Sequence, residues 1–306
     1  MSSQGDEPTG IATQDSVDKL AHQVDSEIDS ITRYSSSSDI RSPLSLLAAI
    51  AADFYRGREL AWRLFVRNLR GMYRQTFLGL FWVFLPPVLN TAFWVFLRNS
   101  TDVLNKADLE INYTVFILTG MIFWQSFIES FQMPLNMLNK NRNMISKLNF
   151  PRESLLLVGL GEVLFDLAIR LLLLIPTFLW FGVSVQGSVL LAPLALLGLV
   201  LLGAGLGLLI LPIGSLYQDV GRFIAVALPF WMILTPIIYP PIDGSVLNWI
   251  NPACPLLVIA RDWTLVGNTE FVQSGWAYGL AALPLFLLGL VVYRISIPVL
   301  IERMTA

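Results

Sequence analysis

Long apolar runs separated by short polar stretches dominate the chain after about residue 75. A helix needs about 20 mostly apolar residues to cross the hydrocarbon core of a bilayer, because it rises about 1.5 Å per residue. The segments that meet or approach this length are 76–97, 111–133, 154–181, 189–211, 223–239 and 276–293. The pattern therefore predicts an all-α polytopic membrane protein with six transmembrane helices.

Before the first span, the pattern is that of an amphipathic helix. Between about residues 46 and 74, apolar side chains such as Trp62 and Phe65 share one face, and arginines fill the neighbouring face. This arrangement is typical of a helix that lies in the membrane interface. The alternative is a basic segment that only orients the first span. The residues that we assign to the interfacial surface are Arg63, Arg67, Arg70, Tyr73 and Arg74.

Residues 240–275, between the last two spans, contain prolines and apolar pieces that are too short to cross a bilayer. Backbone that enters hydrocarbon and returns must be covered by protein or line a water-filled cavity. We therefore expect re-entrant helices in the outer leaflet between spans five and six.

Lys and Arg are distributed unequally between alternate loops. The loops that share a side with both chain termini carry 13 of these residues, and the loops on the other side carry three. Loops rich in positive charge remain in the cytoplasm. The asymmetry predicts a multi-pass protein of the cell (inner or plasma) membrane with both termini in the cytoplasm.

The first 45 residues differ from the rest of the chain. They hold eight Asp or Glu against three Lys or Arg, and four consecutive serines at 35–38. Such a segment buries too little apolar surface to offset the entropy of ordering it. We expect an acidic disordered cytoplasmic tail over residues 1–45 and a transmembrane domain over residues 46–306.

Composition excludes several classes of protein. The chain is 55% hydrophobic and 14% charged with a mean hydropathy of +0.64, whereas soluble domains are about 45–50% apolar and 25% charged. His22 and Cys254 are the single histidine and cysteine, which argues against histidine-based catalysis, a disulfide or a thiolate metal site. The sequence has no phosphate-loop motif for ATP hydrolysis. We predict no catalytic residue and no metal ligand.

Three charges interrupt the third span. Glu162, Asp166 and Arg170 are four residues apart and share one helical face. Charges inside a membrane usually pair or face a watery path, because hydrocarbon does not solvate them. Three interpretations remain open: an ion-pair row that holds the helix to its neighbours, a polar edge of a transport pathway, and proton coupling.

Aromatic residues form a stripe at the start of the first span, where Phe77, Phe81 and Phe84 share a face and Trp82 lies near them. The electron-rich face of a ring attracts the electron-poor C–H face of a sugar. A glycan path along these four residues is one interpretation, and ordinary packing or lipid contact is the other.

The segment between spans two and three mixes apolar residues into a basic background. A solvated loop does not need such residues, whereas a short amphipathic helix that docks into a partner's groove does. A solvated positively charged loop is the alternative. The residues that we assign to this docking segment are Asn141, Arg142, Met144, Ile145, Lys147, Leu148, Phe150, Pro151, Arg152 and Glu153.

Several motifs of this chain form an ordered set. Residues 70–87 read RGMYRQTFLGLFWVFLPP, and residues 141–153 contain Ile-Ser-Lys followed by Phe-Pro-Arg-Glu. Further along come Tyr217-Gln218-Asp219-Val220, the corner at 236–240, and Asn251-Pro252 with Arg261. Together they resemble the motifs of ABC-type polysaccharide export permeases, which export O-antigen, capsular polysaccharide or teichoic acid. The resemblance covers about residues 55–303.

The resemblance implies a permease domain that moves a lipid-linked polysaccharide as a homodimer, together with two copies of a separate cytoplasmic nucleotide-binding ATPase. ATP and Mg would be bound by that partner, and this chain would carry no cofactor and no ATPase site. The docking segment would couple ATP hydrolysis to the spans, and the interfacial helix would lie where the glycan lipid enters. An ABC permease for a lipid or hydrophobic drug, and a proton-coupled transporter using Glu162 and Asp166, are the alternative functions.

Overall fold

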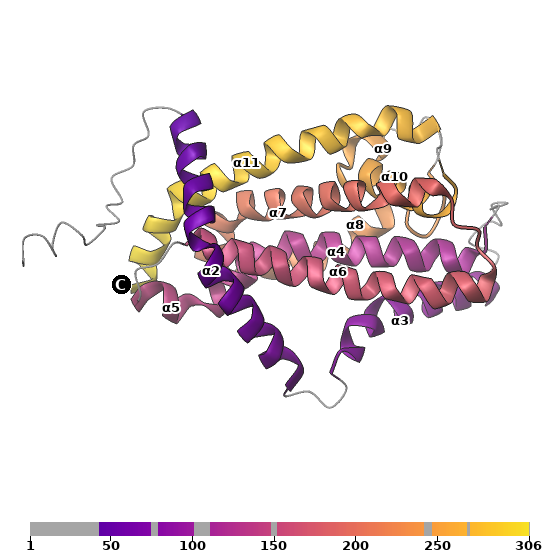
Figure 1. Cartoon of the computed structure of the whole chain (residues 1–306), viewed down its shortest axis with the longest axis horizontal. Helices are drawn as coiled ribbons and strands as arrows, with labels where there is room; N and C mark the ends of the chain where they lie inside the picture. Colours follow the sequence, from indigo (N-terminus) through magenta and orange to yellow (C-terminus); the bar gives the residue numbers. More distant parts are fainter. Residues whose placement is uncertain are drawn as a thin grey trace, which may run out of the picture. The chain divides into compact units, whose positions relative to one another are not determined.

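The computed structural model describes residues 43–74, 79–100, 111–147, 152–241, 247–267 and 270–305. These residues are helical or lie in short connections, so the predicted all-α class is confirmed (Figure 1). Residues 1–42 of the predicted tail lie outside the described residues. The helices are α2 (Pro43–Arg74), α3 (Phe81–Ser100), α4 (Tyr113–Lys140), α5 (Arg142–Lys147), α6 (Glu153–Phe181), the 3-10 helix η1 (Gly187–Leu191), α7 (Ala192–Leu216), α8 (Gln218–Leu234), α9 (Leu247–Ile250), α10 (Ala253–Leu265) and α11 (Glu270–Thr305).

Among the described residues, four helical segments are long and apolar enough to cross a membrane by length and composition. They are Phe81–Ser100, Tyr113–Lys140, Gly187–Leu216 and Gly279–Leu300, and they overlap the predicted first, second, fourth and sixth spans. The predicted third and fifth spans correspond to α6, which carries three charges within its apolar run, and to α8, which has 17 residues.

The helices do not end where the predicted spans end. Hydropathy marks only the apolar part of a helix, and the backbone of α4 continues to Lys140 and that of α11 to Thr305. The predicted fifth span, 223–239, is displaced toward the N-terminus, since α8 runs from Gln218 to Leu234. Thr235 is extended, with φ −97° and ψ 136°, because the following Pro236 disfavours helical backbone in the residue before it.

The core lies between α4, α6, α7, α10 and α11, and α4, α6, α7 and α11 run side by side in Figure 1. Glycines of α7 permit close packing. A Cβ atom on Gly205 would lie 2.9 Å from the Cα of Phe286 in α11. A Cβ on Gly203 would lie 2.8 Å from the carbonyl oxygen of Phe127 in α4. Small residues therefore let α7 approach a helix on either side.

The helix α2, predicted as interfacial, crosses α6 at a steep angle in Figure 1 and contacts α6 and α11. Its Phe65 ring packs edge-on against Phe165 of α6, with ring centroids 6.2 Å apart. Gly161 leaves room for Phe65, because a Cβ there would lie 3.2 Å from the ring. The apolar face of α2 is thus partly covered by α6.

The short helix α10 packs against α7, α11, α4 and η1, and most of its residues are buried. Asn251 lies two residues before it, and its side chain accepts a hydrogen bond from the backbone N–H of Ala253 at 3.2 Å. The same side chain accepts from Trp231 Nε1 and donates to Thr235 Oγ1, at 3.0 and 2.8 Å. Asn251 therefore links the start of α10 to the end of α8.

Two helices have little cover. In α3 only Val83, Pro87 and Thr91 are buried, and in α8 only Leu228 is buried. Large apolar side chains such as Phe96 and Phe230 stand exposed on these helices. Exposed apolar surface of this extent indicates contact with lipid or with another protein.

Candidate functional site

The predicted docking segment includes the turn between α4 and α6. Asn141 ends α4, and its side-chain Nδ2 donates to the Met137 carbonyl at 2.9 Å. The carbonyl of Asn141 then accepts from the backbone N–H of Met144 and of Ile145, both at 2.9 Å, which starts α5. Asn141 is buried and holds this turn.

The side chains of α5 divide into two groups. Ile145 is 5% exposed and belongs to the chain's own core, and Met144 packs against that core. Arg142 is exposed. The side chain of Lys147 is not described, and Leu148, Phe150 and Pro151 lie outside the described residues. Of the described side chains of α5, Arg142 is thus the one that is exposed.

Three helices meet in an ion cluster at the end of the docking segment. Arg294 of α11 places Nη1 2.8 Å from Asp53 Oδ2 of α2 and 2.9 Å from Glu153 Oε1 of α6. Asp53 and Glu153 are both buried, so Arg294 offsets negative charge that water does not solvate. The neighbouring Arg152 carbonyl accepts from Tyr293 Oη at 3.1 Å. The end of the docking segment is therefore attached to α2 and α11.

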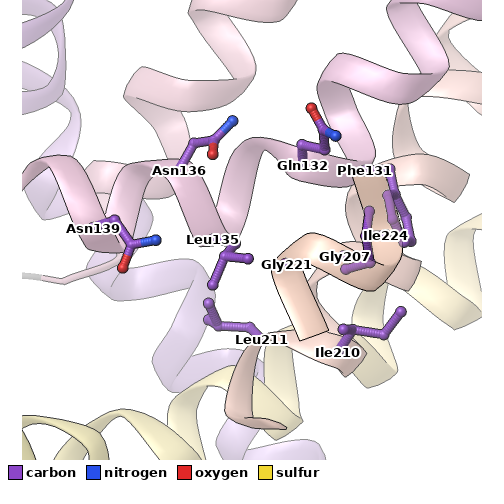
Figure 2. A pocket seen from close by; sticks show the side chains of 10 residues that line it. All are labelled: Phe131, Gln132, Leu135, Asn136, Asn139, Gly207, Ile210, Leu211, Gly221 and Ile224. Carbon is purple, nitrogen blue, oxygen red and sulfur yellow. The ribbon is translucent and has the colours of Figure 1, made fainter. Parts of the chain in front are cut away.

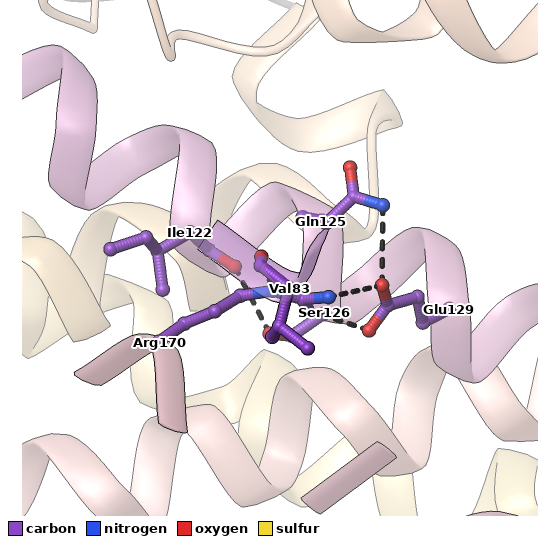
Figure 3. A network of polar contacts seen from close by, with 6 residues as sticks. All are labelled: Val83, Ile122, Gln125, Ser126, Glu129 and Arg170. Atoms are coloured by element: carbon purple, nitrogen blue, oxygen red, sulfur yellow. Dashed lines mark hydrogen bonds and ion pairs between the residues drawn. The ribbon is translucent and has the colours of Figure 1, made fainter. Parts of the chain in front are cut away.

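Arg170 of α6 is the centre of a second polar network, drawn in Figure 3. Its Nη1 donates to Glu129 Oε2 of α4 at 2.6 Å, and its Nη2 pairs with the other oxygen of the same carboxylate. Its Nε donates to the Val83 carbonyl of α3 at 3.2 Å. Pro87 leaves this carbonyl free, because proline has no N–H to donate to the residue four positions earlier. One guanidinium thus joins α3, α4 and α6.

The charged row predicted in the third span is divided in the structure. Arg170 is 3% exposed and pairs with Glu129, whereas Glu162 accepts from Asn68 Nδ2 of α2 at 2.8 Å. Lys140 Nζ lies 3.9 Å from the same Glu162 oxygen. Asp166 is half-buried. Arg170 therefore attaches α6 to α3 and to the middle of α4, and Glu162 attaches α6 to α2 and, through Lys140, to the end of α4.

The residues predicted for the glycan path and the interfacial surface lie on α3 and α2. Phe81 and Trp82 are exposed at the start of α3, Phe84 is half-buried, and Phe77 lies outside the described residues. On α2, Arg63, Arg67 and Arg70 are exposed. Arg63 bonds Glu59 at 2.6 Å. The side chains of Tyr73 and Arg74 are not described.

A cavity of about 230 Å³ lies between α4, α7 and α8, and Figure 2 shows it from close by. Its polar side consists of three amide side chains from α4. Its remaining lining is apolar or glycine. The lining residues are Phe131, Gln132, Leu135, Asn136, Asn139, Gly207, Ile210, Leu211, Gly221 and Ile224.

Arg261 of α10 is fully buried. Its guanidinium lies 3.8 Å from the centre of the Phe116 ring in α4, and its Nη1 donates to the Pro236 carbonyl at 2.7 Å. A cation over a ring face is attracted by the electron-rich face. Arg261 therefore ties α10 to α4 and to the corner after α8.

Comparison with known proteins gives consistent results. The family described as "ABC-2 type transporter" matches residues 59–261. An O-antigen export system permease protein RfbA of Myxococcus xanthus is 25% identical over 191 residues, which cover 62% of this chain and 72% of the relative. Two proteins of the same description from Klebsiella pneumoniae are 26% and 24% identical over 218 residues, 68% of this chain and 81% of each relative.

Proposed function

Because the chain belongs to the ABC-2 type transporter family, matched over residues 59–261, we propose that it is the membrane subunit of an exporter for a lipid-linked polysaccharide. The observation that carries this proposal is the description of three relatives as O-antigen export permeases, which align with 62–68% of the chain. An O-antigen type of glycan is therefore the favoured substrate, ahead of capsular polysaccharide or teichoic acid.

The energy for export comes from another polypeptide. The ABC-2 membrane domain lacks the ATPase domain, so two cytoplasmic ATPase subunits bind ATP and Mg and act on a homodimer of this chain. The exposed apolar faces of α3 and α8 supply surface for contacts between copies or with lipid.

The proposed membrane arrangement has six spans: α3, α4, α6, η1 with α7, α8, and α11. Both termini are cytoplasmic, as the distribution of Lys and Arg favours. α9 and α10 enter the outer leaflet and return, because the 13 residues of α10 extend for only about 20 Å. Coverage of α10 by α7, α11 and α4 supports this placement.

Force from the ATPase is transmitted through α5. In the sequence, α5 follows α4 after one residue and precedes α6. It also contacts α11. The Arg294 cluster attaches the start of α6 to α2 and α11. A displacement of α5 therefore acts on the interfacial helix and on the bundle together.

The test measures the glycan on the surface of the organism that makes this chain. Deleting the chain should abolish the surface glycan and leave lipid-linked glycan in the cytoplasmic membrane, and the intact chain should restore export only with an active partner ATPase. Export that continues after loss of every associated ATPase, or a surface glycan unchanged by the deletion, would refute the proposal. An ATPase variant unable to hydrolyse ATP is the matched control.

A further inference from the structure

One face of α4 is open, and that face is polar. Between Val115 and Leu138, the residues that are not buried are Gln125, Ile128, Glu129, Gln132, Leu135 and Asn136. Asn139, one turn further, is exposed. At about 100° per residue, the polar positions fall within an arc of about 80° on the helix. We call Gln125, Glu129, Gln132, Asn136 and Asn139 the α4 polar stripe.

The α4 polar stripe does not suit contact with lipid tails. It runs for about 21 Å along the helix at 1.5 Å per residue, most of the thickness of a hydrocarbon core of about 30 Å. Polar side chains turned toward hydrocarbon lose their hydrogen bonds to water. The open faces of α3 and α8 carry large apolar side chains instead. The stripe therefore faces a polar environment inside the assembly.

Space is available beside the stripe. Gln132, Asn136 and Asn139 form one side of the cavity in Figure 2. Gly207 of α7 and Gly221 of α8 line it without side chains. The rest of the lining is apolar, so amide groups and apolar surface meet in one cavity. A sugar chain has the same two kinds of surface, because its hydroxyl groups form the rim and its C–H groups form the faces.

The charge of the stripe identifies the kind of ligand. Glu129 is its single ionisable residue, and Arg170 pairs with both oxygens of that carboxylate. Gln125 Nε2 also donates to Glu129, at 3.3 Å. Amides, which make up the remainder, both donate and accept hydrogen bonds, as hydroxyl groups do. The stripe thus offers hydrogen bonds without net charge.

We propose that the α4 polar stripe and its cavity bind the uncharged, hydroxyl-rich part of the glycan during transport. This inference rests on the proposed function and extends it. It would add a hydrogen-bonding surface on α4 to the aromatic glycan path that the sequence predicts at the start of α3. Because single amide contacts are exchanged easily with water, the surface holds the chain in the path and still lets it slide.

Cysteine labelling in inside-out membrane vesicles that contain the complete transporter tests the proposal, because the reagent then reaches the cytoplasmic end of α4. Gln132→Cys and Asn136→Cys place a thiol on the stripe, and Asn139→Cys is a third position should one variant fail to assemble. Ser126→Cys, on the buried side of α4, and Leu172→Cys, at an exposed apolar position of α6, are the controls. The native Cys254 is buried and gives little background. The reagent is a charged maleimide that does not cross membranes.

Each variant is labelled in vesicles from two matched strains, one that makes the glycan and one blocked at its first glycosyl transfer. In the blocked strain, stripe cysteines should react about tenfold or more faster than both controls, because a thiol in water ionises more readily than one in an apolar environment. In the producing strain, the glycan should slow this labelling several-fold.

Equal labelling in the two strains would overturn the inference, since the stripe would then be wet without touching the glycan. Labelling of the stripe cysteines as slow as that of Leu172→Cys would also overturn it. So would a disulfide between the Asn136→Cys residues of two copies, if the glycan does not reduce the labelling of the stripe. Failure of the proposed function is separate, because it shows as an unchanged surface glycan when the whole chain is deleted.

Discussion

The Arg170 guanidinium makes three polar contacts. Two are with the Glu129 carboxylate, and the Arg170 side chain is 3% exposed and that of Glu129 25% exposed. The third is a hydrogen bond to the Val83 carbonyl, which Pro87 leaves free. Replacing both members of a buried pair by apolar residues is often neutral, whereas removing one leaves an uncompensated charge. The residue's role is therefore best measured by the difference between single and double variants.

We predict that Arg170→Met lowers the free energy of unfolding by about 3–5 kcal/mol, because Glu129 loses its partner in a partly buried position. Adding Glu129→Gln should recover much of that loss. Thermal unfolding of the purified transporter in lipid nanodiscs measures both. The control is Arg222→Met, whose pair with Asp219 is 78% and 90% exposed and should change stability by no more than about 1 kcal/mol.

Close helix packing gives a second prediction at this scale. Gly205→Ala should destabilise the chain by about 1–3 kcal/mol, because its Cβ would lie 2.9 Å from the Phe286 Cα and backbone must shift. Gly71→Ala in α2 has open space around its Cβ, and should stabilise its helix by up to about 1 kcal/mol. Similar unfolding temperatures for the two variants would contradict this account.

Sequence reasoning found individual charged residues more readily than their partners. Glu162, Asp166 and Arg170 stand out because charge interrupts an apolar run, and an ion-pair row to neighbouring helices was one of three interpretations. That interpretation named no partner, and the structure pairs Arg170 with Glu129, 41 residues earlier. That pairing depends on how α4 and α6 rotate against each other, which hydropathy does not encode. The Asp53–Arg294 contact was missed for the same reason.

Among the helices, α5 separates two functions that the sequence placed on one segment. Ile145 is fixed in the core, and Arg142 stands outside. The spacing of apolar residues predicted a short docking helix but did not say which of them the chain itself would bury.

The two residues should therefore respond differently to substitution. Ile145→Asn should lower stability by a few kcal/mol, because a buried amide without partners is costly. Arg142→Glu should leave the unfolding temperature unchanged and weaken the coupling between ATP hydrolysis and export, because it reverses charge on the exposed side of α5. Nanodisc unfolding and the ratio of ATP hydrolysed to glycan exported measure these effects. Unchanged coupling in Arg142→Glu would remove this residue from the partner contact.

The end of α8 had a local signal that the predicted span 223–239 did not follow. Pro236 disfavours helical backbone in the residue before it, and α8 ends at Leu234. The prediction ended the last span at 293, before Arg294, whereas α11 continues to Thr305, and Ile297 and Leu300 of this extension are buried. The existence of the long helices was thus clearer from the sequence than their lengths.

For the whole molecule, the proposed orientation gives a direct test. Arg142→Cys should react with a membrane-impermeant maleimide only from the cytoplasmic side, and Gln186→Cys, in the connection between α6 and η1, only from the outer side. Both positions are exposed. Labelling both from one side would contradict six alternating spans. Wild-type chain, with its buried Cys254, measures the background.

The sequence was least informative about assembly. Hydropathy predicts which helices are apolar but not which apolar faces remain open, and the open faces of α3 and α8 emerge only when α4, α6, α7 and α11 have packed. The polar stripe of α4 was likewise hidden, because its amides are spread thinly along a span that reads as apolar overall.

The buried Arg261 has a consequence for biogenesis. A guanidinium in hydrocarbon without partners costs several kcal/mol, and its partners here are the Phe116 ring and the Pro236 carbonyl. Both are synthesised before Arg261 leaves the ribosome. Both groups that bind the Arg261 guanidinium are therefore present when α10 is synthesised. A nascent chain in which α4 is misplaced would leave this cation unpaired, and membrane proteases that remove misfolded proteins would then have access to it.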